Sequence, residues 1–98
     1  MVRWSKRARN ELAAIGDYVA LDKPLVARKW VVKIDDRAEL AALQPRAGRI
    51  VPEFGRPDVR EVFLRSYRIM YRIVPDGIWV LTVFHGAKLL REVDPDAE

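Results

Sequence analysis

The stretch YRIMYRIVPDGIWVLTVFH, residues 67–85, decides the fold of this chain. Two apolar runs, Tyr67–Val74 and Ile78–His85, flank the turn signal PDG, an order that is typical of a β-hairpin. The second run is apolar on both faces, which indicates a central strand that is covered on both sides. The sequence therefore predicts a hairpin whose second strand lies inside a larger sheet.

A two-residue turn at Asp76-Gly77 would fix which residues of this hairpin face one another. Arg68 then lies opposite His85, the only histidine in the chain, because partners are counted outward from the turn. Arg72 is expected further along the same face, since side chains alternate between the two faces of a strand. The other face is expected to lie under helices, and it collects Ile69, Tyr71, Ile73, Val80, Thr82 and Phe84.

Upstream of the hairpin, the sequence predicts one more strand of the sheet and two helices. Val59–Leu64 has the composition of a strand. Apolar residues recur at three- and four-residue steps after Ser5, an expected N-cap, and again after Pro24. The short connection between the two helices predicts an antiparallel pair, and Val2–Trp4 is expected as a short first strand. Helices followed by a sheet indicate an α+β domain.

Length and composition limit the chain to one domain, residues 1–98. It has 98 residues, of which 50% are hydrophobic and 33% charged, as in globular proteins. The absence of cysteine excludes a disulfide framework and a thiolate metal site, and a single histidine argues against a histidine metal centre. We expect no metal and no cofactor. The N-terminus has no signal-peptide pattern and no apolar run approaches the ~20 residues of a membrane span, so we expect a cytoplasmic protein with no membrane partner.

Positive charge is concentrated in the middle of the chain. Residues 46–72 include seven arginines, no lysine and three acids, a net charge of +4. The planar guanidinium of arginine matches phosphate and carboxylate groups. This stretch therefore predicts an anionic partner, either nucleic acid or an acidic protein, and the alternative is a solvated surface rich in arginine.

Arg68 and His85, placed side by side, would suit the cleavage of RNA. The histidine would act as general acid or base, and arginines would stabilise the charge that develops on the phosphate. Arg72 on the same face and Arg60 on the preceding strand would extend the basic surface. In the structural alternative, His85 ends a buried strand and the arginines extend over an apolar sheet with their charged ends in solvent.

Three segments of the chain, taken in order, resemble the RelE/ParE family of toxins from bacterial type II toxin–antitoxin systems. They are VRWSKRARNELAAIGDYV, GRIVPEFGRPDVREVFLRSYRIMYRI and IWVLTVFHGAKLL. The resemblance implies an α+β fold in which a short N-terminal strand and a helical hairpin pack on a curved antiparallel sheet of three to four strands. It also implies a cognate antitoxin that neutralises the toxin within a hetero-oligomer.

The resemblance leaves two targets, because RelE-like members cut mRNA on the ribosome and ParE-like members poison DNA gyrase. Arg68 matches the phosphate-binding arginine of the family, Arg60 matches a basic position, and Lys88 lies near the basic position after the last strand. Val62 occupies a second position that is basic in the family. No tyrosine follows His85, whereas several RelE-like members use a tyrosine there. The VFHGAK ending resembles the ParE branch.

These features favour a ParE-like inhibitor of DNA gyrase that is not an enzyme, with a role in growth inhibition and plasmid stabilisation. The alternative is a RelE-like, ribosome-dependent mRNA endonuclease in which Arg68 and His85 are catalytic. In both cases a basic surface would contact nucleic acid or the antitoxin. Its predicted members are Arg49, Arg60, Arg68, Arg72 and Lys88.

Overall fold

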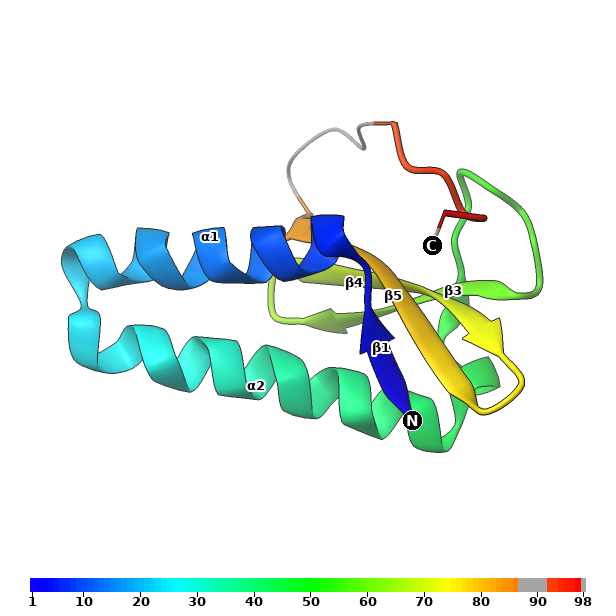
Figure 1. The fold of residues 1–98 in the computed structure, drawn as a ribbon, viewed down its shortest axis with the longest axis horizontal. Coiled ribbons are helices and arrows are strands. Elements are labelled where there is room, and N and C mark those ends of the chain that lie inside the picture. Colours follow the sequence, from blue (N-terminus) through cyan, green and yellow to red (C-terminus); the bar gives the residue numbers. More distant parts are fainter. Residues whose placement is uncertain (87–91, 98) are drawn as a thin grey trace.

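The computed structural model describes residues 1–86 and 92–97. Its helical hairpin projects well beyond the sheet (Figure 1). It consists of α1 (Lys6–Asp22) and α2 (Pro24–Leu43). Ser5 caps α1 by accepting a hydrogen bond from the Ala8 N–H at 3.0 Å, and proline occupies the first turn of α2. The predicted pair of helices is therefore confirmed. A short 3-10 helix, η1 (Pro45–Ala47), leads from α2 to the sheet.

The sheet has five strands and is mixed, which corrects the predicted antiparallel sheet of three to four strands. The strands are β1 (Val2–Trp4), β2 (Arg49–Ile50), β3 (Val59–Leu64), β4 (Tyr67–Val74) and β5 (Gly77–His85). Their spatial order is β1-β5-β4-β3-β2, with β1 parallel to β5 and all other pairs antiparallel. The direction in which β1 pairs depends on the whole intervening chain, and β2 is too short to show a period of two.

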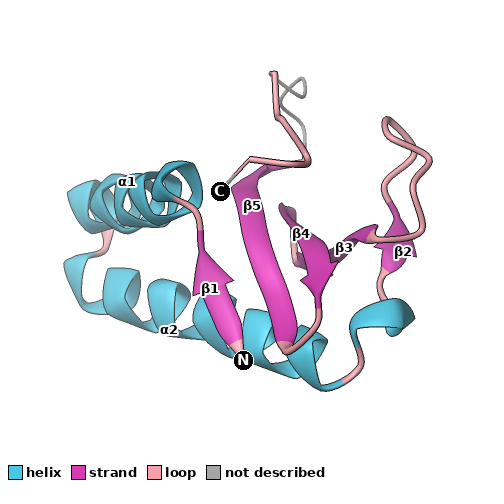
Figure 2. Ribbon diagram, turned by 45° about the vertical axis from the view of Figure 1, so that its right-hand side comes forward, coloured by secondary structure: helices cyan, strands magenta, loops and turns pink. Residues whose placement is uncertain are grey.

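The two faces of the sheet have different covers. Both helices lie on one side (Figure 2), where Ile34 and Ala38 of α2 pack on Ile69, Tyr71 and Val80, all 0% exposed. The opposite side, called the outer face below, carries a smaller apolar cluster under the loop 51–58 and the C-terminal segment 92–97. Its members are Val51, Val59, Met70 and Leu81, with Phe54, Trp79, Phe84 and Val93 packed around them.

The predicted register of the central hairpin is wrong at two points: the two-residue turn is Pro75-Asp76 and not Asp76-Gly77, and a β-bulge follows in β5. The observed partners are Val74 with Gly77, Tyr71 with Val80, Met70 with Thr82, Arg68 with Phe84 and Tyr67 with His85. Leu81 is the extra residue, so side chains beyond it change faces. As a result Val83 joins the core under the helices and Phe84 lies on the outer face, the reverse of the prediction.

The start of α1 supplies the hydrogen-bond partners that the bulge requires. The Ser5 hydroxyl donates to the carbonyl oxygen of Leu81 at 3.0 Å. The Glu11 carboxylate accepts from the Thr82 hydroxyl at 2.7 Å and from the Val83 N–H at 3.1 Å. The polar groups that the bulge leaves unpaired inside the domain are thereby satisfied, and α1 is fixed in position on β5.

Replacing Glu11 with alanine should destabilise the fold through the bulge. Thr82 and Val83 are 0% and 1% exposed, so their donors would lose the acceptor without gaining access to water. We expect urea denaturation to show a loss of about 1–3 kcal/mol in the free energy of unfolding. Glu39→Ala, the same change at an exposed position of α2, should stay within about 0.5 kcal/mol of wild type. Equal stability of the two variants would show that the bulge does not depend on Glu11.

Candidate functional site

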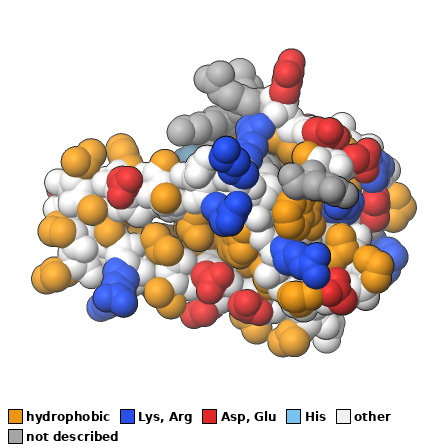
Figure 3. Space-filling view, viewed as in Figure 1, with side chains coloured by type: hydrophobic (Ala, Val, Ile, Leu, Met, Phe, Trp, Pro, Cys, Tyr) orange, Lys and Arg blue, Asp and Glu red, His pale blue; other side chains and the backbone are white. Residues whose placement is uncertain are grey.

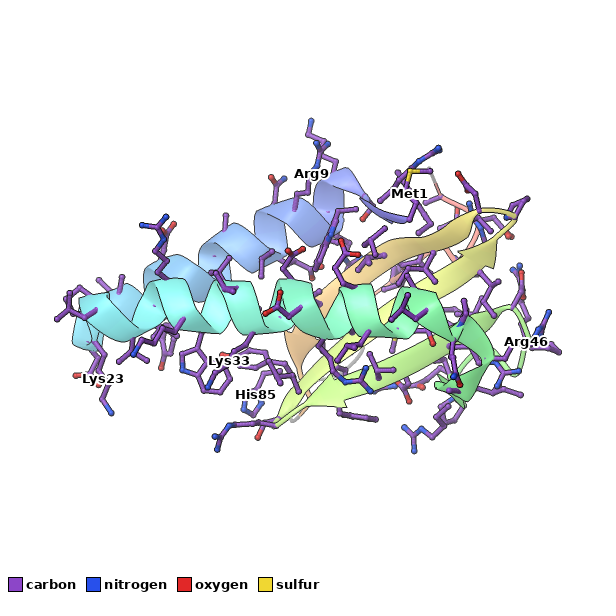
Figure 4. All side chains as sticks on the ribbon, turned by 90° about the horizontal axis from the view of Figure 1, so that it is seen from below. Met1, Arg9, Lys23, Lys33, Arg46 and His85 are labelled. Atoms are coloured by element: carbon purple, nitrogen blue, oxygen red, sulfur yellow. The ribbon has the colours of Figure 1, made fainter. Side chains whose placement is uncertain are left out.

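Arg68 and His85 lie on opposite faces of the sheet, so the predicted cross-strand pair of these two residues is wrong. The His85 ring makes an edge-to-face contact with Tyr67, with the ring centroids 5.6 Å apart, and it lies beside α2 (Figure 4). The Arg68 guanidinium carbon lies 5.3 Å from the ring centroid of Phe84, on the outer face. The bulge causes this separation, because it shifts the alternation of β5 by one residue. The two side chains do not face a common phosphate.

Arg68 belongs to a network of ion pairs on the outer face. Its Nε donates to Glu61 at 2.8 Å, and its two terminal nitrogens donate to the two carboxylate oxygens of Glu53, each at 3.1 Å. Glu61 is only 1% exposed, and it also accepts a hydrogen bond from Arg49 at 2.8 Å. Two guanidinium groups thus neutralise two carboxylates, and the buried charge of Glu61 has a partner on each side.

The network favours the charged forms of Glu53 and Arg68. Hydrogen bonds from Arg68 lower the pKa of Glu53 below its ordinary value. Burial alone would lower the pKa of Arg68, but hydrogen bonds to Glu53 and Glu61 outweigh it, so the pKa of Arg68 is raised. The Arg68 side chain is only 11% exposed, which leaves little of it accessible to a phosphate.

The other predicted basic residues hold loops in place. Arg60 donates to the carbonyl oxygens of Pro57, Arg46 and Gly48 at 2.8, 3.0 and 3.1 Å. Arg72 donates to two carbonyl oxygens of the segment 92–97. Lys88 lies outside the described residues. The predicted surface of five basic residues is therefore divided, in its described part, into separate groups that already have partners within the chain.

A cluster of aromatic and basic side chains beside His85 was not predicted from the sequence. Tyr67 contacts Trp30 of α2, with the ring centroids 5.9 Å apart. Charged atoms of Lys33 and Arg65 each lie 5.7 Å from the centroid of the Trp30 ring. Trp30 is half-buried and joins α2 to the turn between β3 and β4. Within residues 1–86 and 92–97, no group of three or more acidic or histidine side chains could hold a metal ion.

The side of α2 that faces away from the sheet carries four exposed apolar side chains among charged ones. Leu25, Val32, Leu40 and Leu43, which we call the α2 stripe, are 88%, 49%, 60% and 77% exposed. Leu25, Val32 and Leu40 lie about two turns apart and Leu43 about one turn further on, on the opposite side of the helix from Ile34. Hydrophobic side chains are visible over much of the projecting hairpin (Figure 3). Such a surface can bind another protein. None of the helices in the described part of the chain has the length and hydropathy to cross a membrane.

Comparisons with known proteins match almost the whole chain. The family profile described as "ParE toxin of type II toxin-antitoxin system, parDE" matches residues 2–90. The putative toxin Y4kP of Sinorhizobium fredii is 37% identical over 88 residues, which cover 87% of this chain and 86% of the relative. Toxin RelE2 of Caulobacter vibrioides is 29% identical over 89 residues, 90% of this chain and 97% of the relative. A solved structure described as "Chromosomal ParDE TA system from P. aeruginosa" has the same fold, with a TM-score of 0.72, 23% identity, and coverage of 86% of this chain and 92% of that chain.

Replacing Arg68 with alanine should destabilise the fold as well as remove a candidate site residue. Glu53 would lose its two-pronged partner, and the buried carboxylate of Glu61 would keep only Arg49. We expect a loss of about 3 kcal/mol in the free energy of unfolding, measured by urea denaturation. Arg46→Ala removes an exposed guanidinium from η1 and should change stability by less than about 0.5 kcal/mol. A fully stable Arg68→Ala variant would contradict a structural role for the network.

Proposed function

The chain belongs to the ParE toxin family of type II toxin–antitoxin systems, and we propose that it inhibits DNA gyrase by binding, without catalysing a reaction. A cognate antitoxin neutralises it. The engagement of Arg68 by Glu53 and Glu61 is the observation that carries the non-enzymatic part of this proposal. The sequence adds that no tyrosine follows His85.

The charge distribution around Arg68 is unsuited to cleavage of a phosphodiester. Such a reaction requires a donor that is aimed at the position where negative charge develops. A phosphate next to Arg68 would also meet the carboxylates of Glu53 and Glu61, and like charges at such distances repel. Arg60 and Arg72 donate to carbonyl oxygens of the chain itself. These contacts support a role for the outer face in structure and binding.

A second function, cleavage of mRNA on the ribosome, is favoured by the cluster of Tyr67, Trp30, Lys33 and Arg65 beside His85. Here His85 would be the general acid or base, and Lys33 or Arg65, in place of Arg68, would stabilise the phosphate charge. The 29% identity to the relative named RelE2 is consistent with this alternative. Primer extension on mRNA from a cell-free translation reaction tests it, since new 5′ ends at ribosome-occupied codons would replace the gyrase proposal.

We also propose that the antitoxin buries the α2 stripe. This helix uses its Ile34 side for the core, and its Leu40 side has no cover within the described residues. An amphipathic helix of the antitoxin could lie along the stripe and contribute apolar contacts over its length. Because the stripe lies opposite the core, its residues can be changed without opening the packing of α2 on the sheet.

The gyrase proposal predicts the outcome of a supercoiling assay. Purified toxin in excess over gyrase should reduce the conversion of relaxed plasmid to the supercoiled form, and addition of the antitoxin should restore it. A heat-unfolded sample of the same toxin serves as the control for nonspecific binding of a basic protein to DNA. Unchanged supercoiling at a large excess of folded toxin would overturn the proposal.

The antitoxin proposal predicts that Leu40→Glu weakens the complex. A charged side chain in a buried apolar contact should cost at least about 1.4 kcal/mol, a tenfold loss of affinity in isothermal titration calorimetry. Leu21→Glu is the matched control, because Leu21 is 86% exposed and lies on α1, outside the stripe. In growing cells Leu40→Glu should escape neutralisation while its toxicity is retained. Wild-type affinity of Leu40→Glu would exclude the stripe as the antitoxin site.

A further inference from the structure

The C-terminal segment 92–97 returns over the outer face and lies beside the loop between β2 and β3, red next to green in Figure 1. There it occupies a site formed by Arg56, Arg72 and Trp79. We propose that this site binds an acidic peptide turn of a partner protein, and that residues 94–97 occupy it as an internal competitor. The proposal is independent of whether the target is gyrase or mRNA.

Two side chains of the site recognise the main chain of the segment. Arg72 donates to the carbonyl oxygens of Pro95 and Ala97 at 2.8 and 3.2 Å. The indole N–H of Trp79 donates to the same carbonyl of Ala97 at 2.8 Å. Any peptide with this backbone geometry offers the same acceptors, so these contacts do not require the chain's own C-terminus.

Arg56 adds a preference for a carboxylate. Two of its nitrogens donate to the two carboxylate oxygens of Asp96 at 3.1 and 2.9 Å. Two donate to Asp58 at 3.1 and 2.9 Å, which orients the guanidinium towards the segment. These hydrogen bonds lower the pKa values of Asp58 and Asp96. Paired hydrogen bonds of this geometry distinguish a carboxylate from a neutral amide.

The bound segment is a turn that holds its own shape. The Ala97 N–H donates to the carbonyl oxygen of Asp94 at 3.1 Å, and the Asp96 N–H donates to the Asp94 side chain at 2.9 Å. Pro95 has a fixed φ angle, and aspartate followed by proline is a common start of a β-turn. A ligand that is ordered before binding loses little conformational entropy. The site therefore fits an acidic turn of the type Asp-Pro-Asp.

The attachment of the segment is weak enough for exchange. The Asp96 side chain is 67% exposed, and exposed ion pairs contribute little to stability. Among the residues of the segment, Val93 packs on the outer apolar cluster and lies before the turn. A partner that presents a similar turn, and that makes further contacts elsewhere, can displace residues 94–97 without disturbing the core under the helices.

The test uses the full-length chain with Asp96→Arg, which places a like charge opposite Arg56 and weakens the internal competitor. A fluorescently labelled synthetic peptide of residues 92–98 is titrated and followed by anisotropy. We expect at least about tenfold tighter binding than to wild type, because a tethered competitor acts at an effective concentration of the order of millimolar. Glu92→Arg makes the same charge change at an exposed residue whose backbone carbonyl accepts a hydrogen bond from Arg7, and it should match wild type.

A second peptide checks the chemistry of recognition. Asparagine in place of the aspartate that corresponds to Asp96 should weaken binding to the Asp96→Arg protein by about tenfold. Thermal unfolding verifies that the variant is folded, and Asp96→Asn, which adds no charge, provides a milder release if it is not. If neither variant binds the peptide more tightly than wild type, or if both peptides bind equally, the segment is only a cover of the outer face and the proposal is overturned.

Discussion

The contact between the start of α1 and the bulge at Leu81 is the constraint on which the rest of the structure depends. A bulge inside a sheet leaves backbone groups without ladder partners, and each buried group that stays unsatisfied costs about 1–3 kcal/mol. Ser5 and Glu11 satisfy these groups from more than 70 residues away in the chain. The same contact positions the helical hairpin on the sheet and determines which face each side chain beyond the bulge occupies. The separation of Arg68 from His85 is its direct consequence.

Internal pairing, more than net charge, determines what the arginines of this protein can do. The chain carries a net charge of +4, which by itself favours an anionic partner. Arg68 is nevertheless bound to two carboxylates, and Arg60 to carbonyl oxygens of the loops around it. These contacts stabilise an outer face that is covered by the loop 51–58 and the segment 92–97, whereas helices cover the other face. The arginine-rich stretch is therefore a structural element first, and its capacity to bind a partner depends on which internal contacts can be exchanged.

The local elements could be predicted from the sequence, and the long-range pairings could not. Val59–Leu64 and Tyr67–Val74 are strands with the predicted bounds, and Ser5 caps the first helix as expected. The predicted register is wrong because IWVLTVFH is apolar on both faces. A shift by one residue therefore exposes no apolar side chain, and the sequence pattern cannot reveal it. The sequence identified the arginines as candidate site residues, but it could not show which groups of the chain they bind. The pairing of β3 with β4 and the course of the loop between β2 and β3 bring the carboxylates of Glu61 and Glu53 to Arg68.

The two proposed binding surfaces lie on opposite sides of the molecule and differ in physical character. The α2 stripe is apolar and faces away from the sheet, whereas the site of Arg56 and Arg72 lies on the outer face and depends on charge. Burial of apolar side chains responds little to moderate salt, but an exposed ion pair such as Arg56 with Asp96 weakens as the salt concentration rises. Salt therefore weakens binding mainly at the site of Arg56 and Arg72. A partner that covers both must extend around the edge of the sheet, and the salt dependence of its affinity then reports how much of it has replaced the C-terminal segment.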